Sequence, residues 1–153
     1  MKVLVIVLAA LVASVTVVLV RVRRRYLNVV VRGVSMVPTY TPGDELLLDR
    51  RTSGGPRPGV VVVIRMRHDG PGEITAPGVA ADEQLFLKRV IAVAGDPVPA
   101  DVPGEGPVPP GHLVLRGDGP HSLDSRVWGC VPADRVVGVV LRKLGGQTVS
   151  SSG

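Results

Sequence analysis

A serine and a lysine stand out against the valine-rich sequence around them. Ser35 follows a valine-rich run, with Gly33 two residues before it and Pro38 three residues after it. Glycine lets another backbone approach closely, and the end of a strand can project a hydroxyl group into a groove. A serine between two strands is also a common turn residue, so the position alone leaves both interpretations open.

Lys88 lies in the middle of the apolar run Leu85–Val93. Strand alternation predicts that its side chain shares a face with Phe86 and Val90 and that Arg89 points to the opposite face. A lysine among apolar side chains loses solvation, which lowers the pKa of its amine and favours the neutral form. The alternative is a packed stem whose ammonium group reaches water.

A third polar segment runs from Arg116 to Gly129 and combines turn formers, hydroxyl groups and charges. Asp124 and Arg126 are two residues apart, so on a strand they would share a face and could form an ion pair. His121 could serve as the base of a serine–histidine triad, although nothing in the local sequence favours this. An exposed polar loop would explain any one of these residues better than the whole run.

The sequence predicts no cofactor and no metal site. The histidines, at His68, His112 and His121, are widely separated, and none has the spacing of a metal ligand. The single cysteine, Cys130, excludes an internal disulfide and a cysteine-rich zinc site. No glycine-rich phosphate-binding loop is present.

Short strands must position these residues. The chain has 19 glycines and 14 prolines in 153 residues, too many for a helical bundle and typical of many turns. We predict a small, mainly β domain over residues 26–144 and a disordered tail over residues 145–153. The predicted strands are Asn28–Arg32, Glu45–Asp49, Val60–Met66, Leu85–Val93, His112–Arg116 and Arg135–Leu141.

The N-terminal segment predicts one transmembrane helix. Residues 3–20 carry no charge and as a helix would cover roughly 27 Å, close to a hydrocarbon core of about 30 Å. A cleavable signal peptide is the alternative, but its apolar region is usually only about 7–15 residues long. Arginines follow directly, where a signal peptide would have small residues. We therefore predict a retained membrane anchor over residues 1–25.

The excess of positive charge also lies in this anchor. The chain has 18 Lys and Arg against 13 Asp and Glu, and no acidic residue precedes Tyr26. From Tyr26 onward the basic and acidic residues are equal in number, so a basic nucleic-acid-binding face is not expected.

Taken in order after one apolar anchor, these segments resemble the type I signal peptidase family of serine–lysine proteases. The matching boxes are Ser-Met-x-Pro-Thr at Ser35–Thr39, Lys-Arg-Val-Ile with a closing Gly-Asp at Lys88–Asp96, and Gly-Asp…Ser-x-Asp-Ser-Arg at Gly117–Arg126. Met36 and Arg89 are thereby matched beside the serine and the lysine. The resemblance extends from Gly33 to Gly138.

The resemblance implies a signal-peptidase-like β-domain in which Ser35 is the nucleophile and Lys88 the general base. Ser122 would hydrogen-bond the lysine amine, and Asp124 and Arg126 would form a supporting ion pair. The backbone N–H of Ser35 would supply an oxyanion donor. Some members carry a second donor hydroxyl two residues before the nucleophile, where this chain has Gly33.

Two features depart from the family pattern. The family's Gly-Asp-Asn is Gly117-Asp118-Gly119 here, and the loop from there to Ser122 is one residue shorter. Only about 20 residues separate the second and third boxes, which leaves no room for a large accessory domain. The resemblance therefore implies a minimal, single-domain form.

By this resemblance the protein is a single-pass membrane serine endopeptidase that removes N-terminal leader peptides. Its substrates would be exported or membrane-delivered proteins with small residues at the −1 and −3 positions, bound as an added β-strand. We expect a monomer that contacts membrane lipid, binds no nucleic acid and holds its catalytic domain outside the cytoplasm. Two alternatives are a maturation protease of the same family with one dedicated substrate and a catalytically silent β-domain that binds extended peptides.

Overall fold

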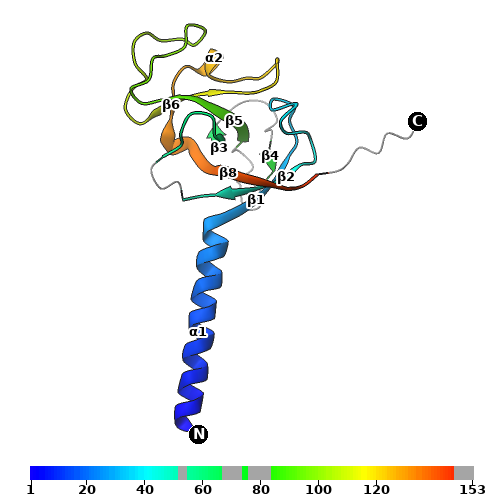
Figure 1. Cartoon of the computed structure of the whole chain (residues 1–153), viewed down its shortest axis with the longest axis vertical. Coiled ribbons are helices and arrows are strands. Elements are labelled where there is room, and N and C mark those ends of the chain that lie inside the picture. The colour runs from blue at the N-terminus through cyan, green and yellow to red at the C-terminus, as the bar shows by residue number, and fades with distance from the viewer. Residues whose placement is uncertain (52–54, 67–73, 76–83, 147–153) are drawn as a thin grey trace, which may run out of the picture.

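The computed structural model describes residues 1–51, 55–66, 74–75 and 84–146, and its fold is a long N-terminal helix followed by a β-domain (Figure 1). The helices are α1 (Lys2–Arg25) and the short α2 (Ser125–Trp128), with a 3-10 turn, η1, at Ala133–Arg135. The strands in the described part are β1 (Tyr26–Val31), β2 (Glu45–Asp49), β3 (Val61–Met66), β4 (Ile74–Thr75), β5 (Gln84–Val93), β6 (His112–Arg116), β7 (Val131–Pro132) and β8 (Val136–Gly145). The predicted fold class, mainly β after one apolar helix, is confirmed.

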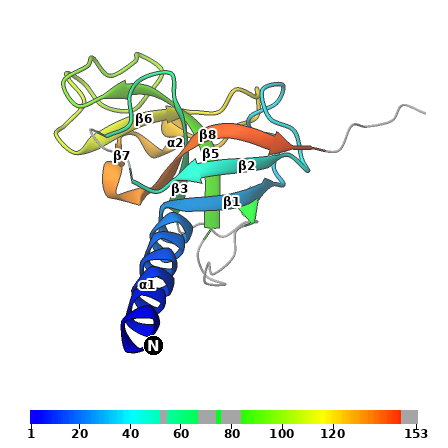
Figure 2. The same ribbon diagram turned by 60° about the horizontal axis from the view of Figure 1, so that its bottom comes forward.

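The described strands form one antiparallel sheet in the order β3-β8-β2-β1-β4-β5-β6-β7. An additional pairing of β3 with β5 closes six of these strands into a ring. Figure 2 shows β8, β2 and β1 lying side by side above the end of α1. Closure leaves few unpaired strand edges, and it places β5 in the middle of the domain.

The predicted strand boundaries hold best where a strand is flanked by turn residues. Two strands, Glu45–Asp49 and His112–Arg116, have the predicted boundaries. The first strand begins at Tyr26 rather than Asn28, because the chain enters it directly from α1 and Tyr26 pairs with Asp49. The short strands β4 and β7 were not predicted.

The last strand is longer than predicted. It continues to Gly145, the first residue of the predicted tail, because β2 offers pairing partners as far as Glu45. Gly146 follows the strand, and residues 147–153 of the predicted tail lie outside the described part of the chain.

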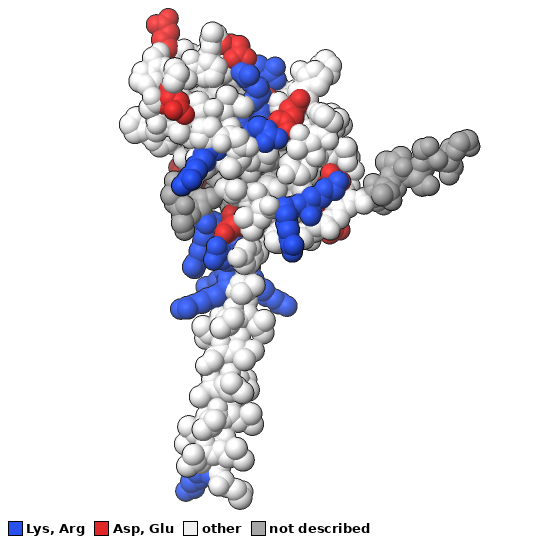
Figure 3. Space-filling view, in the orientation of Figure 1, with Lys and Arg blue, Asp and Glu red and all other residues white. Residues whose placement is uncertain are grey.

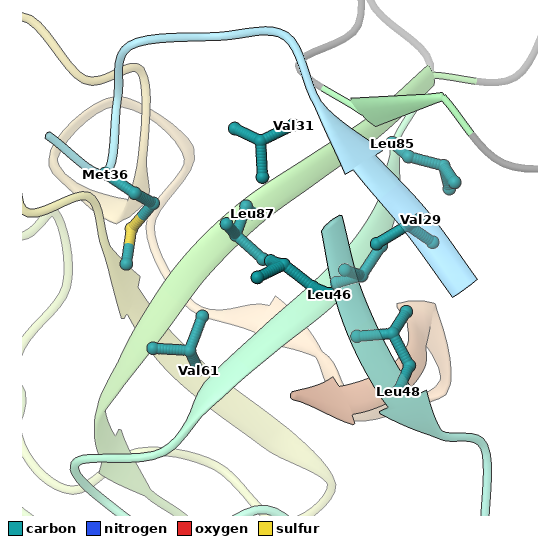
Figure 4. Close-up of a cluster of buried hydrophobic side chains, with 9 residues drawn as sticks. Val29, Val31, Met36, Leu46, Leu48, Val61, Leu85 and Leu87 are labelled. Carbon is teal, nitrogen blue, oxygen red and sulfur yellow. The ribbon is translucent and has the colours of Figure 1, made fainter. Parts of the chain in front are cut away.

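Alternate residues of the strands contribute to two of the three hydrophobic cores in the described part of the chain. One core lies inside the ring and contains Val29, Val31, Met36, Leu46, Leu48, Val61, Val63, Leu85 and Leu87 (Figure 4). The other contains Val62, Ile64, Phe86, Val90, Leu113, Leu115 and Val131. Because β5 contributes to both cores, it is buried on its two faces, and a polar residue in its middle cannot avoid burial.

Helix α1 projects from the domain and buries none of its residues (Figure 1). Its 24 residues include an 18-residue stretch with a mean hydropathy of 3.2, so it is long and apolar enough to cross a membrane. At its end, Arg25 forms a two-pronged ion pair with Asp49, with Nε and Nη2 at 3.1 and 2.8 Å from Oδ2. This pair, together with the direct passage into β1, attaches the helix to the sheet.

Candidate active site

The turn that carries Ser35 follows β1 and is fastened by its neighbours. Met36 packs into the core inside the ring, and the turn is closed by backbone hydrogen bonds from Val37 N to Val34 O and from Tyr40 N to Met36 O. These contacts leave Ser35 only 6% exposed. The serine is therefore held between the core and the rest of the domain rather than on an exposed loop.

Lys88 meets Ser35 across the interior of the domain. Its Nζ lies 2.9 Å from Ser35 Oγ in a hydrogen bond that joins residues 53 apart in the sequence. The Lys88 side chain has no exposed surface, so its amine does not reach water. Its Nζ also lies 5.7 Å from the centre of the Phe86 ring, on the face that strand alternation predicted. Burial of this kind favours the neutral amine, which is the form that can accept a proton from a hydroxyl group.

The loop after β6 passes so close to the Ser35 turn that side chains are excluded from it. Gly119 N donates a 2.7 Å hydrogen bond to Ser35 O. A Cβ atom on Gly119 would lie 2.8 Å from Val34 O, and one on Gly117 would lie 2.6 Å from Ser35 O. Position 119 therefore has a physical requirement for glycine, since the loop lies where a larger residue would not fit.

The predicted ion pair between Asp124 and Arg126 is present, but on a different element. Asp124 is the N-cap of α2 and accepts from Arg126 N at 3.1 Å, while Arg126 Nη2 lies 2.9 Å from its Oδ2. The prediction that the two residues share a strand face is wrong, because the chain turns into a helix at Asp124. Helix capping brings the charges together instead.

Asp124 also fastens the loop, because its Oδ2 accepts from Gly117 N at 3.0 Å. Burial raises the pKa of this carboxyl group, but hydrogen bonds from Arg126 and from the Gly117 backbone hold the pKa below its usual range overall. The same ion pair raises the pKa of Arg126. The carboxylate is therefore ionised and anchors both ends of the third box.

Ser122 does not make the expected hydrogen bond to the lysine amine. Its Oγ is buried and has no hydrogen-bond partner within the described part of the chain. The hydroxyl instead fills the space that a side chain on Gly117 would occupy. In the folded loop, Ser122 therefore lies against the backbone of Gly117.

A second ion pair, between Arg89 and Asp118, was not predicted from the sequence. Together with Thr39 it links the three boxes. Arg89 Nε and Nη2 donate to the Asp118 carboxylate at 2.9 and 2.6 Å, and Thr39 Oγ1 donates to Oδ2 at 2.6 Å. Arg89 also donates to Gly59 O at 2.7 Å. The hydrogen bonds from Arg89 lower the pKa of Asp118. The sequence could have suggested this contact, because Thr39, Arg89 and Asp118 each lie in one of the three matched boxes.

The other candidate residues do not join this site. His121 is exposed and forms no hydrogen bond within the described residues, so the structure gives the triad alternative no support. Gly33 lies in the chain leading from β1 to the serine turn, and His68 lies outside the described residues. Among the described residues, no three His, Cys, Asp or Glu side chains are grouped as metal ligands.

The comparison with protein families covers all three boxes. The chain matches the family model described as signal peptidase, peptidase S26, over residues 2–102 and 99–143. The search of curated proteins gave no match. The family match includes the Ser35 turn, β5 and the loop from β6 to α2, which are the segments that meet around the buried lysine. The chain therefore belongs to the signal peptidase family, peptidase S26.

Proposed function

We propose that this peptidase is a membrane-anchored serine endopeptidase that removes N-terminal leader peptides with a Ser35–Lys88 dyad. Membership of the signal peptidase family supports a peptidase that acts on leader peptides. The observation that carries the dyad is the 2.9 Å hydrogen bond between Ser35 Oγ and the fully buried Lys88 Nζ. The length and apolar character of α1 support the anchor.

In this proposal the neutral Lys88 amine accepts the proton of Ser35 Oγ as that oxygen attacks the scissile carbonyl carbon. Lys88 then gives the proton to the departing amine, and an ester between Ser35 and the leader peptide remains. A water molecule attacks this ester while Lys88 takes its proton, and the return of that proton to Oγ releases the leader peptide. The backbone N–H of Ser35 stabilises the oxyanion.

The remaining residues of the boxes act as supports in this scheme. Asp124 and Arg126 fix the loop that lies against the serine turn, and Arg89 with Asp118 ties that loop to β5. Each ion pair is two-pronged, a geometry that restricts orientation as well as distance. Rigid support of this kind matters because a displacement of about 1 Å can cost roughly a hundredfold in rate.

The dyad is tested by measuring cleavage of a synthetic leader peptide ending in Ala-x-Ala by the full chain in detergent micelles. We expect Ser35→Ala and Lys88→Met each to lower the rate by about 10⁴–10⁶, and the double variant to be little worse, because the two residues act as one unit. Methionine keeps the volume of the buried lysine and preserves the packing around it.

Matched substitutions away from the site are the controls. Ser14→Ala removes a hydroxyl that bonds only within α1, and Lys143→Ala removes a lysine paired with Asp44. Both should retain cleavage. Activity of Lys88→Met within tenfold of the parent would exclude the dyad, and a parent chain that binds the peptide without cleaving it would favour the silent peptide-binding domain.

A further inference from the structure

The arginines around the end of α1 take no part in the proposed catalysis. Figure 3 shows basic side chains gathered where the helix meets the domain, above a long uncharged surface. Here a groove of about 350 Å³ is lined by Thr16, Val17, Val20, Arg21, Arg24 and Arg51. We propose that this groove binds an anionic phospholipid. The proposal rests on the membrane anchoring proposed above.

The fold brings these residues together from two elements. Val17, Val20, Arg21 and Arg24 are spaced at three, four and seven residues, so they share one face of α1. Arg51 comes from the chain beyond β2, which is held against the helix end by one backbone bond and, through Asp49, by the ion pair with Arg25. Arg50 N donates to Arg25 O at 2.8 Å, and Arg51 N donates to Asp49 Oδ1 at 2.9 Å.

The arginine side chains of the groove form no ion pair within the described part of the chain. Arg21, Arg24 and Arg51 are all exposed. Asp49, the carboxylate beside them, is already paired with Arg25. Three guanidinium groups around one groove repel each other, and a phosphate group would relieve that repulsion while accepting two-pronged hydrogen bonds.

The apolar half of the groove distinguishes a lipid from a free anion. Val17 and Val20 are 52% and 43% exposed and continue the groove away from the arginines. The uncharged run ends at Val20, so in a bilayer the arginines would lie at headgroup depth and the valines beside the acyl chains. A phosphate with an attached acyl chain fits both halves, whereas a soluble phosphate would use only the arginines.

The test measures the relative affinity of two lipids for the full chain in phosphatidylcholine bilayers. Trace spin-labelled phosphatidylglycerol and spin-labelled phosphatidylcholine are compared, and the fraction of each label that is immobilised gives their relative affinity. We expect the parent to prefer phosphatidylglycerol. Arg24→Gln with Arg51→Gln should lower that preference about fivefold for each arginine removed, which corresponds to about 1 kcal/mol per charge near a membrane surface.

A variant with the same loss of charge is the control. Arg32 and Arg142 are exposed residues outside the groove, so Arg32→Gln with Arg142→Gln should keep the parent's preference. Equal affinity of the parent for both lipids, or an equal loss in both variants, would overturn the proposal. Displacement of the labelled lipid by glycerol phosphate at the same concentration would also overturn it, because the site would then be one for soluble anions.

Two further measurements separate this proposal from the proposed function. Arg24→Gln with Arg51→Gln should cleave the leader peptide in detergent at the parent's rate, since neither arginine contacts the dyad. Flotation of the full chain with vesicles reports anchoring independently of lipid preference. A chain that floats and cleaves without preferring phosphatidylglycerol contradicts the lipid site alone, whereas a chain that does not float contradicts the anchor.

Discussion

Within the third box, two serines lie close together in sequence but differ in what their hydroxyl groups do. Ser125 Oγ accepts from Leu115 N at 2.8 Å, whereas Ser122 Oγ is buried without a partner in the described structure. Removing a bonded hydroxyl leaves a buried N–H unsatisfied, while removing an unbonded one costs no hydrogen bond. The two residues therefore allow catalysis and stability to be separated.

We predict that Ser122→Ala lowers the cleavage rate by about 10–10³ while the melting temperature stays that of the parent. We propose that Ser122 Oγ, which has no partner among the described residues, turns toward the Lys88 amine when substrate binds, so its removal weakens positioning rather than folding. Ser125→Ala is the matched control and should lower the melting temperature. An unchanged rate for Ser122→Ala would show that the residue has no orienting role.

Asp124 makes a pH-dependent contribution to stability. Its pKa is lowered in the folded chain, so its ion pair stabilises the fold above the unfolded value of about 3.9, and the contribution is lost as the pH falls through the lowered folded value. We expect Asp124→Asn to lower the free energy of unfolding by about 3 kcal/mol at pH 7. This is the low end for breaking a buried ion pair, because Arg126 keeps part of its hydration.

Urea unfolding of parent and variant at pH 7 and near pH 3 checks this expectation. The difference in unfolding free energy between the two chains should narrow at the lower pH. The exposed pair of Asp101 with Arg116 provides the control, and Asp101→Asn should change stability by no more than about 0.5 kcal/mol. A difference for Asp124→Asn that stays constant with pH would contradict the assigned role.

At the scale of elements, the loop between β6 and α2 controls the shape of the serine turn. Gly119→Ala would place a Cβ atom 2.8 Å from Val34 O, so the loop must move and its hydrogen bond to Ser35 O must lengthen or break. We predict a loss of roughly a hundredfold in cleavage rate. Gly119→Asn, which adds a larger side chain at the same place, should be no better.

Gly145→Ala is the control for this substitution, because no atom lies within 4 Å of the added Cβ. Its cleavage rate and melting temperature should match those of the parent. If Gly119→Ala cleaved at the parent's rate, the contact between the loop and the serine turn would have no role in positioning the nucleophile.

The elements also show what a sequence can and cannot predict. The apolar neighbours of Lys88 left two outcomes open, a buried amine or one that reaches water, and the structure shows the first. The strands Glu45–Asp49 and His112–Arg116 followed from the turn residues around them. The two-residue strands β4 and β7 are too short to have a period of their own. The contact of Arg89 with Asp118 depends on how distant segments pack, which only the matched boxes could have suggested.

At the scale of the whole molecule, several arginines lie where α1 joins the domain. Their position bears on which side of the membrane the domain occupies. An excess of Lys and Arg normally stays in the cytoplasm. Only Lys2 and the amino terminus precede the apolar run, whereas four arginines follow it within five residues. Charge counting therefore places residues 26–153 inside the cell, while the proposed activity needs them where leader peptides emerge.

We predict that the domain lies outside the cytoplasm, because charge bias is one contribution to insertion and the proposed substrates are presented on the outer side. Alkaline phosphatase fused after Gly153 should be active, and green fluorescent protein fused at the same place should not fluoresce in an export-competent cell. Replacing Arg23 and Arg24 by Gln reduces the opposing charge, so it should raise phosphatase activity further or leave it at its maximum.

The reverse pattern, a fluorescent fusion with an inactive phosphatase, would place the domain in the cytoplasm. Because the general leader peptidase would then not meet its substrates, that result would favour a dedicated maturation protease acting on a protein before its export.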